Sequence, residues 1–508
     1  MARSTVQINP RWPGGIAAGL VVMLTLGTLA AVASRAGWSL RLGTADWAAI
    51  RFTVIQAFVS AAISCALAIP VARALARRRF WGRSAVITLL GAPFLLPVIV
   101  AVFGLLAVFG RGGVLNDGLA AMGLPTMSIY GFHGVVLAHV FFNLPLVTRL
   151  LLQGWLAIPA ERFRLAASLN APIGRLLEWP MLRASLPGAF LVVFLICLTS
   201  FAVALTLGGG PRATTVELAI YQALRFEFDL GRAALLALVQ FCLCALAAVV
   251  AWRVSLTGGM GTGLDRVVHR WDGSRVLDAA AIGLAVVFLA LPLAMIVWRG
   301  IGGLTEMPAD IWRAAVRSIF VAVTSAALCI MTALALALRG GVTVSVVGVL
   351  PLAASSLVVG TGLFILIYPL ASPTEWALVV TAVVNATLAL PFGLRTITPS
   401  VDAVARDYAR LGASLGMSRV TWVTRIVIPR IRQPLGFAAG LAAALSMGDL
   451  GVVTLFAGND QETLPLAMYR LMGAYQMQAA AGAGVLLLGL TLGVFWLCDQ
   501  GGRRNADL

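Results

Sequence analysis

The chain has 508 residues, of which 60% are hydrophobic and only 11% are charged, whereas about a quarter of the residues in a soluble domain are charged. This composition excludes an ordinary soluble protein, and apolar runs long enough to cross a bilayer recur along the whole sequence. The net charge is +17, and every basic residue is Arg, because the sequence contains no Lys.

The apolar runs predict about twelve membrane-spanning helices and therefore an all-α integral membrane protein. The expected spans are 14–33, 53–74, 85–109, 130–152, 186–208, 232–254, 276–298, 313–338, 344–370, 376–397, 435–457 and 479–498. The first run ends in Ala31-Val32-Ala33, which is similar to a signal-peptide cleavage site. That run is long for a signal peptide and is followed by further apolar runs, so an uncleaved first span is favoured.

The distribution of Arg predicts how the spans are oriented. If the N-terminus is cytoplasmic, the inside loops and tails hold 26 Arg and the outside ones hold 11, which together give the 37 basic residues. The dense group Arg77-Arg78-Arg79 then lies inside, in agreement with the positive-inside rule. We therefore expect both termini in the cytoplasm, and we attribute the basic balance to membrane topology and not to nucleic-acid binding.

A polar, Arg-rich segment of about 25 residues occurs twice. Arg164-Leu-Ala-Ala-Ser-Leu-Asn170 is repeated 246 positions later as Arg410-Leu-Gly-Ala-Ser-Leu-Gly416. The prolines that close the two segments, Pro180 and Pro429, are 249 positions apart, so the first segment is three residues shorter.

The repeat extends beyond these loops. Matching stretches precede them at 145–149 and 391–395 and follow them at 214–221 and 462–469, and 53–75 is weakly similar to 318–340. Corresponding spans are six apart, an even number, so the two halves have the same orientation and are predicted to be parallel repeats. The expected division is a tail and first span (1–52), a first half (53–254), a linker with an extra span (255–312), a second half (313–498) and a tail (499–508).

Several kinds of chemistry are excluded or disfavoured. A phosphate-binding G-x-x-x-x-G-K-[ST] loop needs Lys, which the chain lacks. The six cysteines lie in or beside apolar runs and are expected to pack, without a disulfide framework. The three His are too sparse for a metal site. We therefore expect no metal, no cofactor and no catalytic residue on this chain.

Four polar residues inside predicted spans are candidates for a solute pathway. His139 aligns with Asn385 of the second half, and Asn143 follows His139 by one helical turn. Such residues usually form hydrogen bonds between helices, and a pathway role is the alternative. Asp449 is the clearest case of a charged residue inside a predicted span. It either faces the pathway or lies at a hydrated helix end.

Two outside loops carry acidic residues and offer a place for a docking partner. One contains Gly208–Arg212 with Glu217, Glu227 and Asp229, and its counterpart contains Asn459, Asp460 and Glu462. Ordinary solvated loop charges are the alternative.

The repeated inside loops have the pattern of short amphipathic helices. In the second loop Leu411, Leu415 and Ile426 can form one side, and the other side carries the charged residues Arg406, Asp407, Arg410 and Arg419. A cytoplasmic helix of this kind suits a groove on a partner protein.

The second loop resembles the EAA loop of ATP-binding-cassette (ABC) importer permeases, whose pattern is E-A-A, three residues, G, nine residues and I-x-L-P. Gly416, Ile426, Ile428 and Pro429 match this spacing, whereas the E-A-A positions hold Arg410, Leu411 and Gly412. The first loop departs further, with Asn170 in place of the glycine.

The resemblance implies two coupling helices, near 161–172 and 407–418, that dock a cytoplasmic ABC ATPase dimer. The implied loop residues are Glu161, Arg164, Ala166, Ala167, Asn170, Pro180, Asp407, Arg410, Ala413, Gly416, Ile426 and Pro429.

A further stretch, Leu198–Leu224, together with the sequence Glu178-Trp179-Pro180, is similar to the fused permease subunits of bacterial thiamine importers. This resemblance implies a non-catalytic inner-membrane subunit that passes thiamine or its phosphates, served by a periplasmic binding protein. Fused ferric-iron permeases share the architecture and are the alternative for the substrate.

Two other classes compete with this interpretation. An ion-driven secondary transporter would need several intramembrane acids, and few are present beyond Asp449. An intramembrane enzyme would need a converging Ser/His or paired-Asp set, and the sequence has no G-x-S-x-G motif.

Overall fold

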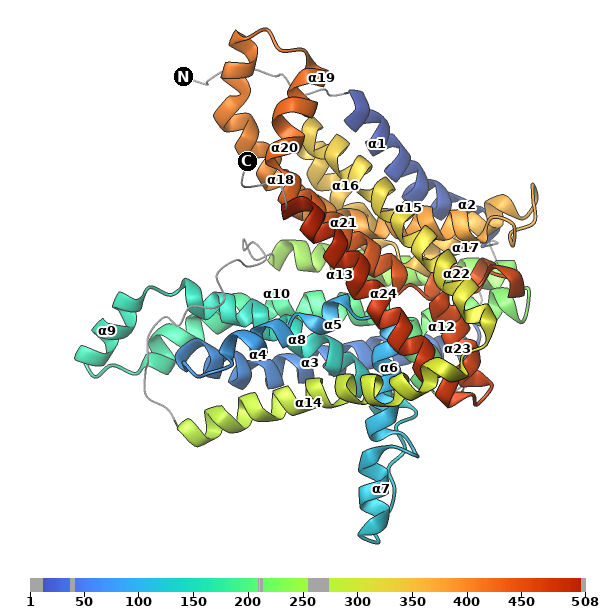
Figure 1. Ribbon diagram of the computed structural model, residues 1–508, viewed down its shortest axis with the longest axis horizontal. Coiled ribbons are helices and arrows are strands. Elements are labelled where there is room, and N and C mark those ends of the chain that lie inside the picture. The colour runs from blue at the N-terminus through green and yellow to red at the C-terminus, as the bar shows by residue number, and fades with distance from the viewer. Residues whose placement is uncertain (1–11, 37–41, 209, 211–212, 255–273, 504–508) are drawn as a thin grey trace. The chain divides into compact units, whose positions relative to one another are not determined.

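The computed structural model describes residues 12–36, 42–208, 210, 213–254 and 274–503, and all of the regular structure in these residues is helical (Figure 1). Eleven of the helical segments are long and apolar enough to cross a membrane. The predicted all-α membrane fold is therefore confirmed. The end of the tail at 504–508 and most of the predicted linker, 255–273, lie outside the described residues.

The helices up to the end of the first half are α1 (Trp12–Val22), η1 (Met23–Gly27), α2 (Thr28–Arg35), α3 (Thr44–Arg77), α4 (Arg83–Leu89), α5 (Ala92–Leu95), α6 (Val98–Phe109), α7 (Val114–Ala121), α8 (Phe132–Ala157), α9 (Ala160–Ser168), η2 (Gly174–Glu178), α10 (Trp179–Leu198), α11 (Ala202–Leu207), α12 (Val216–Arg225) and α13 (Leu230–Val254). Here η1 and η2 are π-helical turns.

The remaining helices are α14 (Arg275–Gly303), η4 (Leu304–Glu306), α15 (Ala309–Arg339), α16 (Val342–Ala353), α17 (Ser356–Ile367), α18 (Ala377–Ser414), α19 (Arg419–Trp422), η5 (Val423–Val427), α20 (Ile428–Arg430), α21 (Arg432–Met447), α22 (Gly451–Phe456), η6 (Asn459–Gln461), α23 (Leu464–Gly473) and α24 (Met477–Arg503). Of these, η5 is π-helical, whereas η4 and η6 are 3₁₀ turns.

Several predicted spans are interrupted: 85–109 comprises α4, α5 and α6, 186–208 includes parts of α10 and α11, and 435–457 includes parts of α21 and α22. The break that lowers the number of long helices lies in the predicted span 344–370. This span consists of α16 and α17, and the chain is extended at the two residues between them. Pro351 cannot donate to the helical ladder, and Ser355 caps the new helix by accepting a hydrogen bond from the amide of Val358 at 3.1 Å. Each piece alone is too short to span a bilayer, which explains why eleven long helices are found where about twelve spans were predicted.

The chain divides into two compact units. We call 41–219 with 242–302 the first-half unit, and 1–40 with 220–241 and 303–508 the second-half unit. The first is built around α3, α8 and α10, and the second around α15, α18 and α21. Their cores are mostly Ala, Val and Leu, and the small Ala side chains allow helices to approach closely.

Each unit also contains a helix that precedes the other half in the sequence. The N-terminal helices α1 and α2 pack on α15 and α17 of the second-half unit. Helix α14, which precedes the second half, packs in the first-half unit, where Phe288 and Phe141 of α8 form an edge-to-face pair with ring centres 5.8 Å apart. The segment that precedes each half therefore packs in the unit of the other half, and residues 220–241 of the predicted first half also belong to the second-half unit.

An equivalent hydrogen bond is present in both units, at the end that is predicted to lie outside. In the first-half unit Thr53 Oγ1 accepts from the amide of Val216 at 2.9 Å. In the second-half unit Ser318 Oγ accepts from the amide of Leu464 at 2.7 Å. Both partners lie at the offsets that the sequence repeat predicts, so the repeat extends to individual polar contacts.

Candidate coupling loops

The first repeated loop projects from the ends of α8 and α10, and Figure 1 shows α9 at its tip. Helix α8 stops at Ala157 because Pro159 disfavours a helical conformation at the preceding residue, Ile158. A separate helix, α9, then begins, and its Phe163 side chain is fully buried in the core of the unit. This aromatic anchor fixes one face of α9 and leaves the opposite face free.

The second loop is built without a break. Helix α18 continues from the membrane segment to Ser414, so the predicted coupling helix at 407–418 is largely its last two turns. The Arg430 guanidinium lies over the ring of Tyr408, 4.0 Å from its centre, and connects the returning chain to this helix.

Each candidate coupling helix is followed, at the equivalent position, by a residue in the left-handed backbone conformation. Asn170 has a φ of 48° and Gly416 a φ of 61°. The next amide then bonds back to a carbonyl five residues earlier, from Ala171 to Ala166 at 2.8 Å and from Met417 to Gly412 at 3.0 Å. Asn tolerates the left-handed region better than most residues, so its replacement of the expected glycine preserves the backbone turn.

Each loop returns to the membrane through a π-helical turn followed by a proline. The turn η2 precedes Pro180, and η5 precedes Pro429. Because proline has no N–H, it interrupts the ordinary helical ladder at the point where the turn widens. Gly174 follows Asn170 by four positions, whereas Val423 follows Gly416 by seven, and the extra residues form α19. The three-residue difference therefore removes one helical turn and keeps the rest.

An exposed pair of leucines is repeated on the two helices. The exposed fractions are 60% for Leu165, 68% for Leu169, 55% for Leu411 and 62% for Leu415. Each pair has a four-residue spacing and so lies on one helical face. The expected apolar side of the second loop is thus confirmed for Leu411 and Leu415 but not for Ile426, which is half-buried against the core.

The first-loop pair, Leu165 and Leu169, was not among the predicted site residues. The 246-residue offset that relates Arg164 to Arg410 also relates these leucines to Leu411 and Leu415, and that signal would have identified them.

The other predicted loop residues fall into two groups. Glu161 and Arg164 form an exposed ion pair at 2.9 Å, and Ala166 faces the core. The remaining exposed ones are Ala167, Asn170, Pro180, Asp407, Arg410, Ala413 and Gly416, whereas Pro429 is half-buried. These positions surround the leucine pairs, and their assignment to coupling stays a prediction.

The polar residues predicted for a pathway form hydrogen bonds between helices. In the first-half unit His139 Nδ1 is 3.3 Å from Ser60 Oγ, and the Asn143 amide donates to the carbonyl of His139 at 2.8 Å and to Cys197 Sγ at 3.5 Å. All three sequence-predicted residues of this type, His139, Asn143 and Asn385, are at most 5% exposed.

The second-half unit repeats this cluster. Asn385 donates to Ser446 Oγ at 3.1 Å, and Ser446 donates to Ser325 Oγ at 2.9 Å. The position of Asn385 corresponds to His139, and that of Ser446 to Cys197. This geometry agrees with the interhelical alternative, and a role in the pathway stays a prediction.

Asp449 lies in the break between α21 and α22. Its Oδ1 accepts a hydrogen bond from the amide of Gly451 at 3.2 Å, so the carboxylate caps the short helix α22. The residue is partly exposed but its Oδ2 atom is buried, and the corresponding residue of the first half is Ser200. Asp449 therefore lies between two helix ends, as one of the two alternatives predicted. Its role in a solute pathway stays a prediction.

The chain is similar over its whole length to curated permeases. It is 37% identical to the thiamine transport system permease protein ThiP of Salmonella typhimurium, over 100% of this chain and 99% of the relative. The identity is 37% to ThiP of Escherichia coli, over 99% of both chains, and 35% to ThiP of Brucella abortus, over 97% and 96%. The chain belongs to the ThiP permease family. No protein-family model matches it.

Family membership makes the chain a transport permease of the membrane, and it removes the intramembrane-enzyme alternative. Among the described residues there is also no group of three His, Cys, Asp or Glu side chains that could hold a metal ion.

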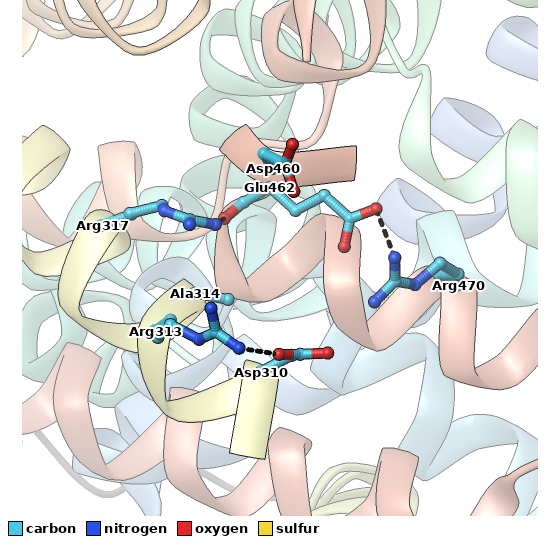
Figure 2. Close-up of a pocket in the computed structure, with 7 residues that line it drawn as sticks. All are labelled: Asp310, Arg313, Ala314, Arg317, Asp460, Glu462 and Arg470. Atoms are coloured by element: carbon cyan, nitrogen blue, oxygen red, sulfur yellow. Dashed lines mark hydrogen bonds and ion pairs between the residues drawn. The ribbon is translucent and has the colours of Figure 1, made fainter. Parts of the chain in front are cut away.

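A charged pocket of about 210 Å³ lies in the second-half unit of this permease (Figure 2). It is lined by residues from the start of α15, from the predicted second outside loop, which contains η6, and from α23. Arg470 pairs with the buried Glu462 carboxylate at 2.9 Å, and Arg317 donates to the Glu462 carbonyl at 3.5 Å. Arg313 pairs with Asp310 at the rim.

Burial raises the pKa of the Glu462 carboxyl, although Arg470 and Arg317 act in the opposite direction. The first half has Thr214 and Gln222 at the positions of Glu462 and Arg470. The ion pair of this pocket is therefore a feature of the second half alone. Of the first outside loop, Gly209, Pro211 and Arg212 lie outside the described residues.

Proposed function

We propose that this permease forms the pathway for thiamine, or its phosphates, across the bacterial inner membrane, and that an ABC ATPase dimer bound to the two loops drives it. The observation that carries the ATPase assignment is the exposed leucine pair, present on a left-handed-capped helix in each half. The relatives' names support thiamine as the solute.

The leucine pairs supply the chemistry of docking. Full burial of a leucine side chain contributes about 1.5–3 kcal/mol, so two pairs contribute several kcal/mol to a complex. The exposed charges around them, such as Arg164 and Arg410, would set the orientation and encounter rate of the partner more than its affinity. A pair on each half suits a partner with two equivalent binding grooves.

The Arg distribution supports a cytoplasmic position for these loops and for both termini. The ATPase would then bind there, and a periplasmic binding protein would deliver solute to the opposite face. The charged pocket around Glu462 and Arg470 is the feature of that face best suited to a charged protein surface. ATP would be bound and hydrolysed by the partner, which biases the permease between two states.

The test is uptake by liposomes that contain this chain, its candidate ATPase and internal ATP, with the candidate binding protein outside. We expect uptake of labelled thiamine that stops when ATP is replaced by a non-hydrolysable analogue. Thiamine pyrophosphate should compete, and ferric iron should not.

Each other outcome selects a different conclusion. Iron uptake without thiamine uptake would change the substrate and keep the class. Thiamine uptake that needs an ion gradient and no ATPase would replace the proposal with a secondary transporter.

A further inference from the structure

The turn that ends the first coupling loop is joined to α3 by a two-pronged ion pair. Arg73 Nε lies 2.7 Å from Glu178 Oε1, and Arg73 Nη2 lies 2.8 Å from Oε2. The Glu178 side chain is 7% exposed, so its charge depends on this partner. The carboxylate also lies over Gly174, where an added Cβ would be 3.4 Å from Oε2. The Glu178 carboxylate thus attaches the end of η2 to α3 and lies close to the first residue of the same turn.

One turn further along α3, the same face of the helix is tied to α14. Arg77 donates from Nε to Asp278 Oδ2 at 2.9 Å and from Nη2 to Oδ1, and Arg78 Nε also donates to Oδ2. Asp278 lies in the first turn of α14 and its side chain is 7% exposed. Because Arg73 and Arg77 are four residues apart, the cytoplasmic end of α3 bridges the loop and α14.

The second half makes the corresponding contact without charge. The counterparts of Arg73 and Glu178 are Leu338 and Val427, and both are buried in one apolar cluster. An apolar contact at this place is therefore compatible with the fold. Since a buried ion pair is often no more stabilising than an apolar pair of similar size, stability alone does not account for the charges in the first half.

We propose that Glu178 is a positioning residue for the first coupling loop. Through Arg73 it holds η2 on α3, so that a displacement of α9 by the ATPase moves α3 and α14 with it. A bidentate Arg–carboxylate pair fixes direction as well as distance, which suits the loop that lacks the α19 turn and is separated from α8 at Pro159. This inference rests on the proposed function, because it assumes an ATPase at the loop.

The variants Glu178→Gln and Arg73→Gln test it in the reconstituted complex. The readouts are solute imported per ATP hydrolysed, binding of the ATPase, and melting temperature. We expect both variants to lower solute per ATP by about tenfold, which is the small end of the effects measured for close charge pairs at protein interfaces, with ATPase binding nearly unchanged. The exchanged pair, Arg73→Glu with Glu178→Arg, should restore most of the loss.

A purely structural role gives a different pattern. Glu178→Gln would then be harmless, because a neutral side chain needs no cation, and only Arg73→Gln would lower the melting temperature. Unchanged solute per ATP in Glu178→Gln would overturn the proposal. The apolar pair Arg73→Leu with Glu178→Val copies the second half and should also restore coupling, since the turn is again attached to α3.

A control in the same unit is Arg299→Gln, which removes a hydrogen bond from Arg299 Nη2 to the carbonyl of Gly112 at 3.0 Å, near the end of α14 opposite to Asp278. It should leave solute per ATP unchanged. Failure of the two hypotheses can be told apart: absence of ATP-dependent uptake in the wild type removes the proposed function, whereas normal coupling in Glu178→Gln removes only this inference.

Discussion

The two candidate coupling loops share their backbone geometry and differ in how they are attached. Both end in a left-handed residue, both return through a π-helical turn and a proline, and both expose two leucines. The first is separated from its membrane helix and held by an ion pair, whereas the second continues from α18 and is held by apolar contacts. The comparison indicates that the shape presented to a partner is kept, while the chemistry behind it is free to change.

The largest expected effect comes from breaking the left-handed turn. Gly416→Pro should abolish ATP-driven uptake, because proline fixes φ near −65° and cannot adopt the observed 61°. Gly416→Asn copies the first loop and should keep most activity, as should Asn170→Gly. The measurement is uptake normalised to the amount of permease in the membrane. Full uptake by Gly416→Pro would show that the shared turn is not needed.

Next in size is the loss of an exposed leucine pair. The double change Leu165→Asp with Leu169→Asp, or Leu411→Asp with Leu415→Asp, should weaken ATPase binding by about 100- to 10,000-fold, since it removes apolar burial of about 1.5–3 kcal/mol for each of two side chains. Titration of the detergent-solubilised permease with labelled ATPase measures this.

Leu176→Asp is the control for the leucine pairs. Leu176 is also exposed, but the second half has Arg425 there, so a charge should be tolerated. If it weakened binding as much as the paired changes, the leucine pairs would have no special role.

A smaller, pH-dependent effect distinguishes the outside ends of the halves. Arg470→Gln copies Gln222 of the first half but leaves Glu462 buried without its cation, which should raise the pKa of Glu462 further. We expect this variant to lower the free energy of unfolding by about 1–3 kcal/mol near neutral pH. That loss should shrink as the pH falls through the raised pKa, because protonation removes the buried charge.

Melting temperatures between pH 8 and pH 5 test this. The double variant Glu462→Gln with Arg470→Gln has no such carboxylate, so its difference from the wild type should vary much less with pH. An Arg470→Gln deficit that grew on acidification would contradict the assignment.

The smallest expected effect is at Tyr408. Tyr408→Leu removes the contact with Arg430, which is worth about 0.5–1 kcal/mol at an exposed site, so uptake should fall by no more than about fivefold. The first loop is held by an ion pair to the buried Glu178, so Arg73→Gln should lower uptake more than Tyr408→Leu does. Equal effects of the two variants would remove the predicted contrast in attachment.

The sequence predicted the membrane class, nearly every span and the repeat, because apolar length and internal offsets are local properties. It did not predict the division of 85–109 into α4, α5 and α6, or of 344–370 into α16 and α17. In the second case Pro351 and Ser355 act through backbone geometry inside an uninterrupted apolar run. Comparison with a consensus treated Asn170 as a departure, whereas the structure shows that it performs the same turn as Gly416.

The attachments behind the loops depend on tertiary contacts. Arg73 and Glu178 are 105 positions apart, and Arg77 and Asp278 are 201 apart, so neither pair has a local signature. Asp449 shows the reverse case: its charge within an apolar run was evident, but its role as the cap of α22 depends on a helix break that hydropathy does not report.

The exchange of helical segments has a consequence for how the protein is made. A polypeptide ending near residue 254 would contain α1 and α2 without the α15 and α17 surfaces that they cover, and its α3 would lack the Asp278 partner of Arg77. The complementary polypeptide would carry α14 without α8, on which Phe288 packs, and would expose the face of α15 that α1 covers. Neither half is thus a self-sufficient translation product, and two separately synthesised fragments would have to find each other in the membrane before either could complete its fold.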